Sequence, residues 1–291
     1  MPNSIDLAKI YVPLLDEAYK NASLTADLDA SADLVREGFN ANEIVIPKLD
    51  MDGLGDYSRN DGYVKGDATL VWETVKCDYD RGRKFTVDDL DNIETGGGAF
   101  GRLSGEFIRT KVVPELDAYR FAKYASVDGI STAEADLATG QAAIDAIADA
   151  MAKMDDDEVP TEGRLLYITP ALRRAIAQLD TTKSREVLED FAKITKVPQS
   201  RFYTKIDMLD GKTAEQTAGG FKKAADAKNI NFAIIHPSAV IQAPKLVKPK
   251  ILSPDVNPDA DAWVFGYRLV SHAETYENKL AGIFIHHAKT K

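Results

Sequence analysis

The chain has 291 residues, of which 44% are hydrophobic and 28% charged, as in ordinary soluble globular proteins. No run of eighteen apolar residues occurs, so no membrane-spanning helix is predicted, and a single cysteine, Cys77, excludes intrachain disulfides and thiol-rich metal sites. The formal net charge of -10, without a Lys/Arg cluster, argues against a protein that grips nucleic-acid phosphates; it favours a surface that repels nucleic acid and leaves it free to move.

The N-terminal third is predicted to contain a helical arm and a long hairpin. Residues 1–40 have mixed polarity and no face apolar enough for a deep core. The run NEIVIPKLDM, residues 42–51, is rich in Ile and Val, and Pro47 within it favours an edge or irregular strand. Glycines among charges predict a loop over residues 52–67, and side-chain alternation predicts a returning strand from residue 68.

Both faces of this returning strand carry polar as well as apolar side chains. Leu70 and Trp72 share one face with Lys76, and Val71 shares the other face with Glu73. A two-stranded ribbon with no apolar face is at best marginally stable in water. We therefore expect the hairpin to lie against another copy of the chain.

The middle of the chain is predicted to be helical. Apolar residues recur at helical spacing from Phe100 to Tyr124, which predicts one long helix that Pro114 kinks or restarts. A second helix is predicted over residues 139–154, with Ile144 and Met151 on its buried face.

Beyond residue 160, strands and helices alternate, which predicts an α/β section. The predicted elements are a strand at 164–169, helices at 170–179 and 185–194, and strands at 201–208, 231–237, 263–272 and 280–287, with an acidic loop at 253–262.

The stretch ETGGGAFGRLSGEF contains G-x-G-x-x-G at Gly96, Gly98 and Gly101, the spacing of a dinucleotide-binding loop. Such a loop needs a buried strand immediately upstream, whereas FTVDDLDNIE is acidic and would repel a pyrophosphate. We therefore interpret the glycines as a flexible entrance to the long helix. The alternative is an α/β nucleotide-binding enzyme that uses the GGGAFG turn.

Other catalytic and metal motifs are incomplete. Two segments partly match the ligand spacing of an EF-hand calcium loop. One starts at Asp50 and Asp52, and the other contains Asp255, Asn257, Asp259 and Asp261. Both segments lack the glutamate that closes such a loop. Adjacent strand residues point to opposite faces, so His286 and His287 do not suit one zinc ion, and Ser104 misses the nucleophile-elbow spacing by one residue. We predict no catalytic, cofactor-binding or metal site, and no enzyme activity.

The segments YVKGDATLVWETVKCDYDRGRKFTVDDLDNIET and FIRTKVVPELDAYRFAKYA resemble the hairpin arm and spine helix of tailed-phage and prophage major capsid proteins. FAIIHPSAVIQAPK and the long terminal strands also resemble that family, so the similarity spans residues 42–287. It implies the α+β fold of these coat proteins, with an N-terminal arm, an extended hairpin loop, a peripheral domain and an axial domain. The implied boundaries are 1–41 for the arm, 42–84 for the loop, 85–127 with 245–270 for the peripheral domain, and 128–244 with 271–291 for the axial domain.

The resemblance implies a subunit that self-assembles, as pentamers and hexamers, into an icosahedral head shell around double-stranded DNA that is bound without sequence specificity. It implies location in the virion after assembly in the bacterial host cytoplasm, without a membrane. Since the hairpin begins about forty residues into the chain, we expect a separate scaffolding protein, together with a portal. An encapsulin-like nanocompartment is the alternative shell.

Two groups of residues are expected at contacts between subunits. The hairpin contributes Tyr57, Arg59, Lys65 and Trp72, and the acidic loop contributes Asp255, Asp259 and Asp261. The resemblance places the acidic loop where three peripheral domains meet, so like charges there would repel with a strength set by salt.

Overall fold

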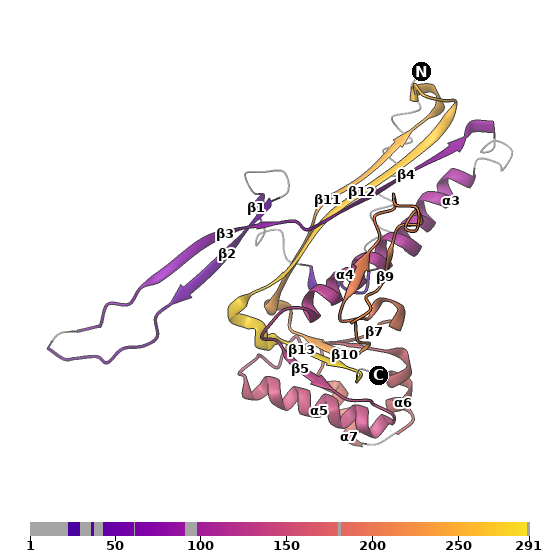
Figure 1. The fold of residues 1–291 in the computed structure, drawn as a ribbon. Coiled ribbons are helices and arrows are strands. Elements are labelled where there is room, and N and C mark those ends of the chain that lie inside the picture. The colour runs from indigo at the N-terminus through magenta and orange to yellow at the C-terminus, as the bar shows by residue number, and fades with distance from the viewer. Residues whose placement is uncertain are drawn as a thin grey trace.

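The computed structural model describes residues 23–29, 36–37, 43–60, 62–90, 98–179 and 182–289. It has three parts: a long ribbon, an elongated body in which a sheet lies along a helix, and a base in which helices cover a second sheet (Figure 1). The chain is therefore α+β, as predicted.

The ribbon consists of β2 (Glu43–Met51) and β3 (Ala68–Lys76), which pair antiparallel from Glu43↔Lys76 to Met51↔Ala68. The short β1 (Arg36–Glu37) pairs with β2 at Ile44 and Val45. Among the described residues Pro47 pairs with β3 alone, so the missing N–H of proline interrupts no second described ladder. The predicted hairpin is confirmed, but the prediction of an edge strand is wrong, because β2 lies between β1 and β3 in the sheet.

The body sheet has the order β11-β12-β4, with β4 (Tyr79–Asp88), β11 (Val240–Leu252) and β12 (Ala262–Thr275) all antiparallel. The two prolines of β11, Pro244 and Pro249, are tolerated because β11 is an edge strand. The sequence-based boundary put residues 79–84 in the hairpin loop. In the structure β4 pairs with β12 along its whole length, and the boundary between loop and peripheral domain stays a prediction.

The long helix runs as α3 (Gly98–Phe107), a π-helical turn (Ile108–Val112) and α4 (Val113–Ala125). Pro114 lies in the first turn of α4, where its absent N–H costs no helical hydrogen bond. The wider π turn ends at Val112, two residues before Pro114. The predicted long helix is confirmed, but it is not restarted at Pro114: the backbone stays helical through Val112 and Val113, and the irregularity is the π turn. The inner side of the helix packs on Phe265, Tyr267 and Leu269 of β12.

The base contains a sheet in the order β5-β13-β10-β6-β7. Its strands are β5 (Ser131–Glu134), β13 (Ile283–His287), β10 (Ile230–Ile235), β6 (Leu165–Ile168) and β7 (Lys193–Lys196). The β5–β13 and β6–β7 pairs are parallel, and the others are antiparallel.

This sheet is buried on both faces. Leu166 and Ile168 pack with α5 (Gly140–Asp156) and α6 (Pro170–Ala177), and α7 (Thr182–Glu189) completes that layer. Leu165 and Tyr167 point to the other face and pack with Phe121 and Tyr124 of α4. Adjacent strand residues therefore serve two cores, which joins the base to the body.

Two predicted elements differ from the structure. Lys193 and Ile194 begin β7 instead of ending a helix, because α7 stops at Glu189. The strand predicted at 201–208 is reduced to β8 (Ile206–Met208), which forms a hairpin with β9 (Phe221–Lys223). Short 3-10 turns occupy Ala26–Leu28, Gln199–Arg201, Pro237–Ala239, Pro254–Val256 and Glu277–Gly282.

Gly140 opens α5 at a point where two backbones almost touch. A β-carbon built there would lie 2.2 Å from the carbonyl oxygen of Ala175 in α6. We expect Gly140→Ala to lower the free energy of unfolding by about 1–3 kcal/mol, measured by urea denaturation, because the helices must separate. In Gly105→Ala of α3 nothing lies within 4 Å of the new methyl group, so this control should gain about 0.5–1 kcal/mol. Equal stability of the two variants would contradict the close approach.

Candidate assembly surfaces

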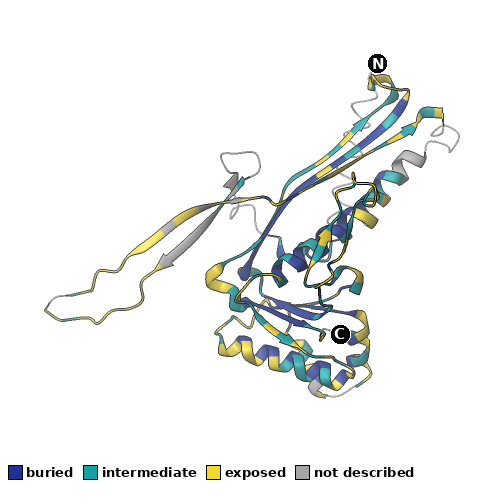
Figure 2. Cartoon of the chain, in the orientation of Figure 1, coloured by how far each residue is buried: buried dark blue, intermediate teal, exposed yellow. Residues whose placement is uncertain are grey.

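The ribbon carries most of the large hydrophobic side chains that the described structure leaves exposed. Leu54 is 108% exposed and Tyr63 is 88% exposed. The others on the ribbon are Met51, Tyr57, Val64, Val71 and Trp72, against Leu90 and Val256 elsewhere in the described chain. Figure 2 shows this exposure along the ribbon and its tip. Such a concentration of apolar surface on a thin projection is typical of a protein–protein contact.

The predicted hairpin residues lie together on this projection. Tyr57, Arg59 and Lys65 lie in the tip, where the rings of Tyr57 and Tyr63 are 4.9 Å apart. Trp72 lies on β3 opposite Pro47. All four predicted residues are exposed, and their contact with another copy stays a prediction.

The ribbon joins the body at Asp78, between β3 and β4. Its carboxylate accepts hydrogen bonds from the hydroxyl of Tyr119 and from Lys123 Nζ at 2.7 Å, both on α4. Burial favours a higher pKa for Asp78, but the bonds from Lys123 and Tyr119 outweigh it and lower the pKa. An ionised Asp78 thus fixes the root of the ribbon to the long helix.

Residues 23–29 are anchored in the body around Asp117 of α4, which is fully buried. The Asp117 carboxylate accepts bonds from Ser23 Oγ at 2.9 Å, from the backbone N–H of Leu24 at 3.1 Å and from Thr25 Oγ1 at 2.9 Å. Arg201 Nη1 lies 3.2 Å from the same carboxylate and balances its charge. This anchor corrects the prediction that residues 1–40 have no deep core face; residues 1–22 lie outside the described residues.

A second layer of the anchor connects to β11. Arg120, fully buried, donates to Thr25 Oγ1 at 2.8 Å and pairs with Asp29 at 3.1 Å. Gln242 donates to Asp29 Oδ1 at 2.9 Å and accepts from the hydroxyl of Tyr124 at 2.6 Å. The sequence analysis missed this network. The sequence LDAYRF could have indicated this network, because Asp117 and Arg120 interrupt the apolar side of the predicted helix.

His272 of β12 is buried, and within the described structure neither ring nitrogen has a hydrogen-bond partner. Burial lowers the pKa of His272 to about 4, while the nearby charges of Asp78 and Lys123 act in opposite directions. The imidazole is therefore neutral in the folded chain at pH 7, and the unfolded chain takes up a proton first as the pH falls.

His272 should make stability fall on acidification. Because its pKa is depressed in the folded state, its penalty is absent above the unfolded value near 6.5 and grows as pH drops towards 4. We expect His272→Leu to reduce the loss of unfolding free energy between pH 7 and 4.5 by about 2–3 kcal/mol, measured with urea. Leu269→Ala destabilises the same strand but keeps the histidine, so its pH slope should match the parent. An unchanged slope in His272→Leu would contradict the prediction.

The acidic loop lies at the far end of the β11–β12 pair from the base (Figure 1). Asp255, Asp259 and Asp261 are all exposed. The loop is shaped by Asn257, whose side chain donates to the carbonyl of Ala262 at 3.0 Å and accepts from the N–H of Asp259 at 3.2 Å. The expected meeting of three such loops stays a prediction.

The glycine motif does not have the surroundings of a dinucleotide site. Gly98 and Gly101 lie inside α3, and Gly96 lies outside the described residues. The preceding strand, β4, is antiparallel to its neighbour, so no parallel strand–helix–strand unit leads into the motif. Gly98 is the first residue of α3, in keeping with the helix-entrance interpretation, whereas Gly101 already lies within the helix.

The residues of the other sequence motifs also make contacts within the fold. Asp52 Oδ2 accepts the N–H of Asp67 at 2.8 Å across the ribbon, and Asp61 lies outside the described residues. His286 is buried against Phe232 with ring centroids 4.9 Å apart, and Ser104 is buried in α3. Within the described ranges no three His, Cys, Asp or Glu side chains gather as a metal site, and no helix is long and apolar enough to cross a bilayer.

The described chain combines a projecting ribbon, a sheet-and-helix body and an α/β base. No protein-family model and no curated protein sequence matches the chain. Solved structures do match. The capsid of cyanophage P-SCSP1u is 13% identical with a TM-score of 0.58, over 93% of this chain and 89% of the other.

Two further structures agree. A virus-like particle from Pyrococcus furiosus is 12% identical with a TM-score of 0.58, over 93% of this chain and 95% of the other. The capsid of Myoviridae phage XM1 is 12% identical with a TM-score of 0.55, over 92% of each chain. The chain therefore has the fold of tailed-phage major capsid proteins, as the resemblance implied.

Proposed function

We propose that this protein is the structural subunit of an icosahedral phage or prophage head shell. The observation that carries the proposal is the ribbon, whose exposed apolar tip requires a partner, on a chain with a capsid fold. The phage capsids among the structural neighbours favour a head shell over a nanocompartment. We assign it no catalytic role.

The proposal also covers the binding partners of the protein and its location. Copies of the chain form pentamers and hexamers, and a separate scaffolding protein and a portal assist assembly. The shell encloses double-stranded DNA without reading its sequence, in keeping with the net charge of -10. The mature protein belongs to the virion, and assembly takes place in the host cytoplasm. The acidic loops with Asp255, Asp259 and Asp261 meet between neighbouring subunits.

Particle formation tests the proposal. We expect the expressed chain, alone or with a co-expressed scaffolding protein, to form rings or closed shells in sedimentation velocity and electron microscopy. The contacts should be heterologous, because a ring of five or six copies repeats one asymmetric contact. A chain that stays monomeric under both conditions would contradict a shell function. A rise in melting temperature with millimolar NAD or ATP would favour the nucleotide-binding alternative instead.

A further inference from the structure

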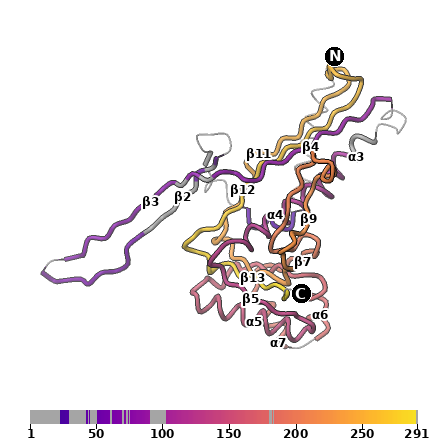
Figure 3. Tube along the Cα trace, in the orientation of Figure 1, coloured from indigo at the N-terminus to yellow at the C-terminus, as the bar shows by residue number. Residues whose placement is uncertain are grey.

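A cavity of about 1040 Å³ opens in the flank of the body. Its walls are β4, the helix around the π turn, and the connection from β8 to β9. In Figures 1 and 3 this connection lies alongside the long helix, on the flank away from the ribbon. Proteins bury drug-sized ligands in pockets of about 300–1,000 Å³, so the cavity is large enough for an organic molecule with two rings.

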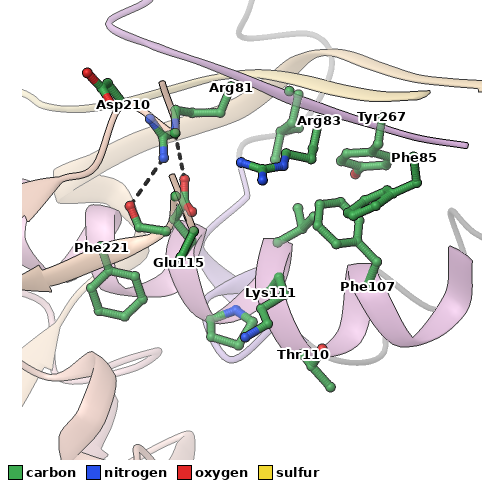
Figure 4. A pocket seen from close by; sticks show the side chains of 18 of the residues that line it. Arg81, Arg83, Phe85, Phe107, Thr110, Lys111, Glu115, Asp210, Phe221 and Tyr267 are labelled. Carbon is green, nitrogen blue, oxygen red and sulfur yellow. Dashed lines mark hydrogen bonds and ion pairs between the residues drawn. The ribbon is translucent and has the colours of Figure 1, made fainter. Parts of the chain in front are cut away.

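Two arginines of β4 hold the wall that the β8–β9 connection forms. Arg81 donates to the carbonyl of Gly220 at 3.2 Å and pairs with Glu115 of α4 at 2.8 Å, as the dashed lines in Figure 4 mark. Arg83 donates to the carbonyl of Thr217 at 3.0 Å. Bonds within the protein thus fasten the connection to β4 at two points. The cavity is therefore preformed, and a ligand need not order its walls.

One end of the cavity is aromatic. The ring of Phe107 lies 4.8 Å from that of Phe85 and 6.4 Å from that of Tyr267 (Figure 4). These rings come from α3, β4 and β12, so the packing of the body fixes their positions. This end suits a further aromatic ring, because aromatic rings attract one another in edge-to-face and offset arrangements.

The four carboxylates that line the cavity are engaged within the fold. Three pair with arginines: Asp80 with Arg268 at 2.6 Å, Glu106 with Arg109 at 2.8 Å, and Glu115 with Arg81 at 2.8 Å. The fourth, Asp210, accepts hydrogen bonds from the N–H groups of Lys212 and Thr213 in its own turn.

Three cations of the lining remain available to an anion. Arg83 donates to a neutral carbonyl, and Lys111 and Lys212 are exposed. Among the described residues these three make no ion pair. Arg83 lies on β4 and Lys111 on the opposing helix (Figure 4), so the cavity offers positive charge from two walls.

The arrangement of charges favours a ligand with a single negative charge. A chain of phosphates would bring its further charges close to the four carboxylates of the lining, which would repel them. One carboxylate can face Arg83 and Lys111 without this cost, and its planar geometry suits a guanidinium group.

We propose that the cavity is a binding site for a small aromatic carboxylate. The ring of the ligand packs against Phe85 and Phe107, and its carboxylate faces Arg83 and Lys111. Such a ligand contacts β4, the long helix and the β8–β9 connection together, so its binding stabilises the folded body. One copy of the chain forms the whole site, so the proposal does not depend on the shell function.

Two fluorescent probes that differ in charge test the proposal on the full chain in solution. Anilinonaphthalene sulfonate carries an anionic group in place of the carboxylate, and phenylnaphthylamine has the same rings without a charge. We expect the sulfonate to bind saturably and Lys111→Glu to weaken its binding about tenfold, because the charge that faces the anion is reversed. The uncharged probe should bind the parent chain and Lys111→Glu equally.

Two further variants control the charge reversal. Lys248→Glu reverses an exposed charge on β11, which does not line the cavity, and should leave the affinity for the sulfonate unchanged. Leu103 lies one turn before Phe107 on the same face of α3, so the indole of Leu103→Trp should occupy the aromatic end and weaken both probes about tenfold.

Amide hydrogen exchange locates the bound probe. We expect the sulfonate to slow exchange in residues 210–221 and in the π turn, and to leave exchange in β2 and β3 unchanged. Slower exchange in the ribbon alone would show that the probe binds the exposed apolar tip, which contradicts the site. Equal affinity of the sulfonate for the parent chain and Lys111→Glu, or an equal loss of both probes in Lys111→Glu, would also contradict it.

Discussion

Removal of the ribbon tip is expected to abolish regular assembly and to leave the body folded. Asp52 and Asp67 face each other across the ribbon, with the N–H of Asp52 3.1 Å from the carbonyl of Asp67. Residues 53–66 can therefore be replaced by Asn-Gly, a two-residue hairpin turn, without displacing β2 or β3. The deleted residues contribute little to the described cores, so we expect the melting temperature to change little.

The control for this deletion keeps the length of the tip and changes its surface. Leu54→Ser, Tyr57→Ser and Tyr63→Ser together remove the exposed apolar side chains but no backbone. We expect sedimentation velocity to show loss of particles for the deletion and the triple variant alike. Normal particles from both variants would contradict a role of the ribbon in assembly, whereas normal particles from the triple variant alone would assign that role to the backbone and charges of the tip.

Much of the fold was predictable because local signals agreed with the tertiary structure. The glycines after residue 52 marked the ribbon loop, and Pro114 marked the region where the long helix changes from π-helical to α-helical hydrogen bonding. The apolar series with Ile144 and Met151 gave α5 its buried face. Each of these signals depends on a few neighbouring residues.

The misses involve pairing between distant residues. Tyr79–Asp88 continues the alternation of β3, and only its pairing with β12, nearly two hundred residues later, separates it from the ribbon. Strand β8 is short because its partner is the three-residue β9. The pattern of one segment does not contain the register of its partner.

The candidate site was predictable to the same degree. Tyr57, Arg59, Lys65 and Trp72 were identified because a mixed-polarity ribbon needs a partner, and they are exposed in the structure. The cavity was not identified, since it needs Arg83, Lys111 and Phe107 from separate elements to converge. The Asp117 anchor was missed because its partners at residues 23–25 are more than ninety residues away.

Asp117→Ala is expected to cause the largest loss of stability among single substitutions. The change would leave the buried face of Arg201 without its countercharge and would orphan the donors of Leu24 and Thr25. Removing one partner of a buried ion pair costs about 3–5 kcal/mol, and we expect this loss in the free energy of unfolding, measured with urea on unassembled chain. Asp27→Ala is the control, because the Asp27–Lys193 pair at 2.5 Å is substantially exposed and should contribute at most about 1 kcal/mol.

The region that loses stability can be located even if the alanine variant folds poorly. Asp117→Asn keeps the shape and an acceptor oxygen but removes the charge opposite Arg201. We expect amide hydrogen exchange of Leu24, whose N–H donates to Asp117, to accelerate in the asparagine variant while exchange in β10 of the base stays slow. The anchor joins residues 23–29 to α4 and, through Gln242, to β11, so its loss should release the N-terminal segment before the base opens. Uniform acceleration across the chain, or none, would show that Asp117 does not act as a local anchor of that segment.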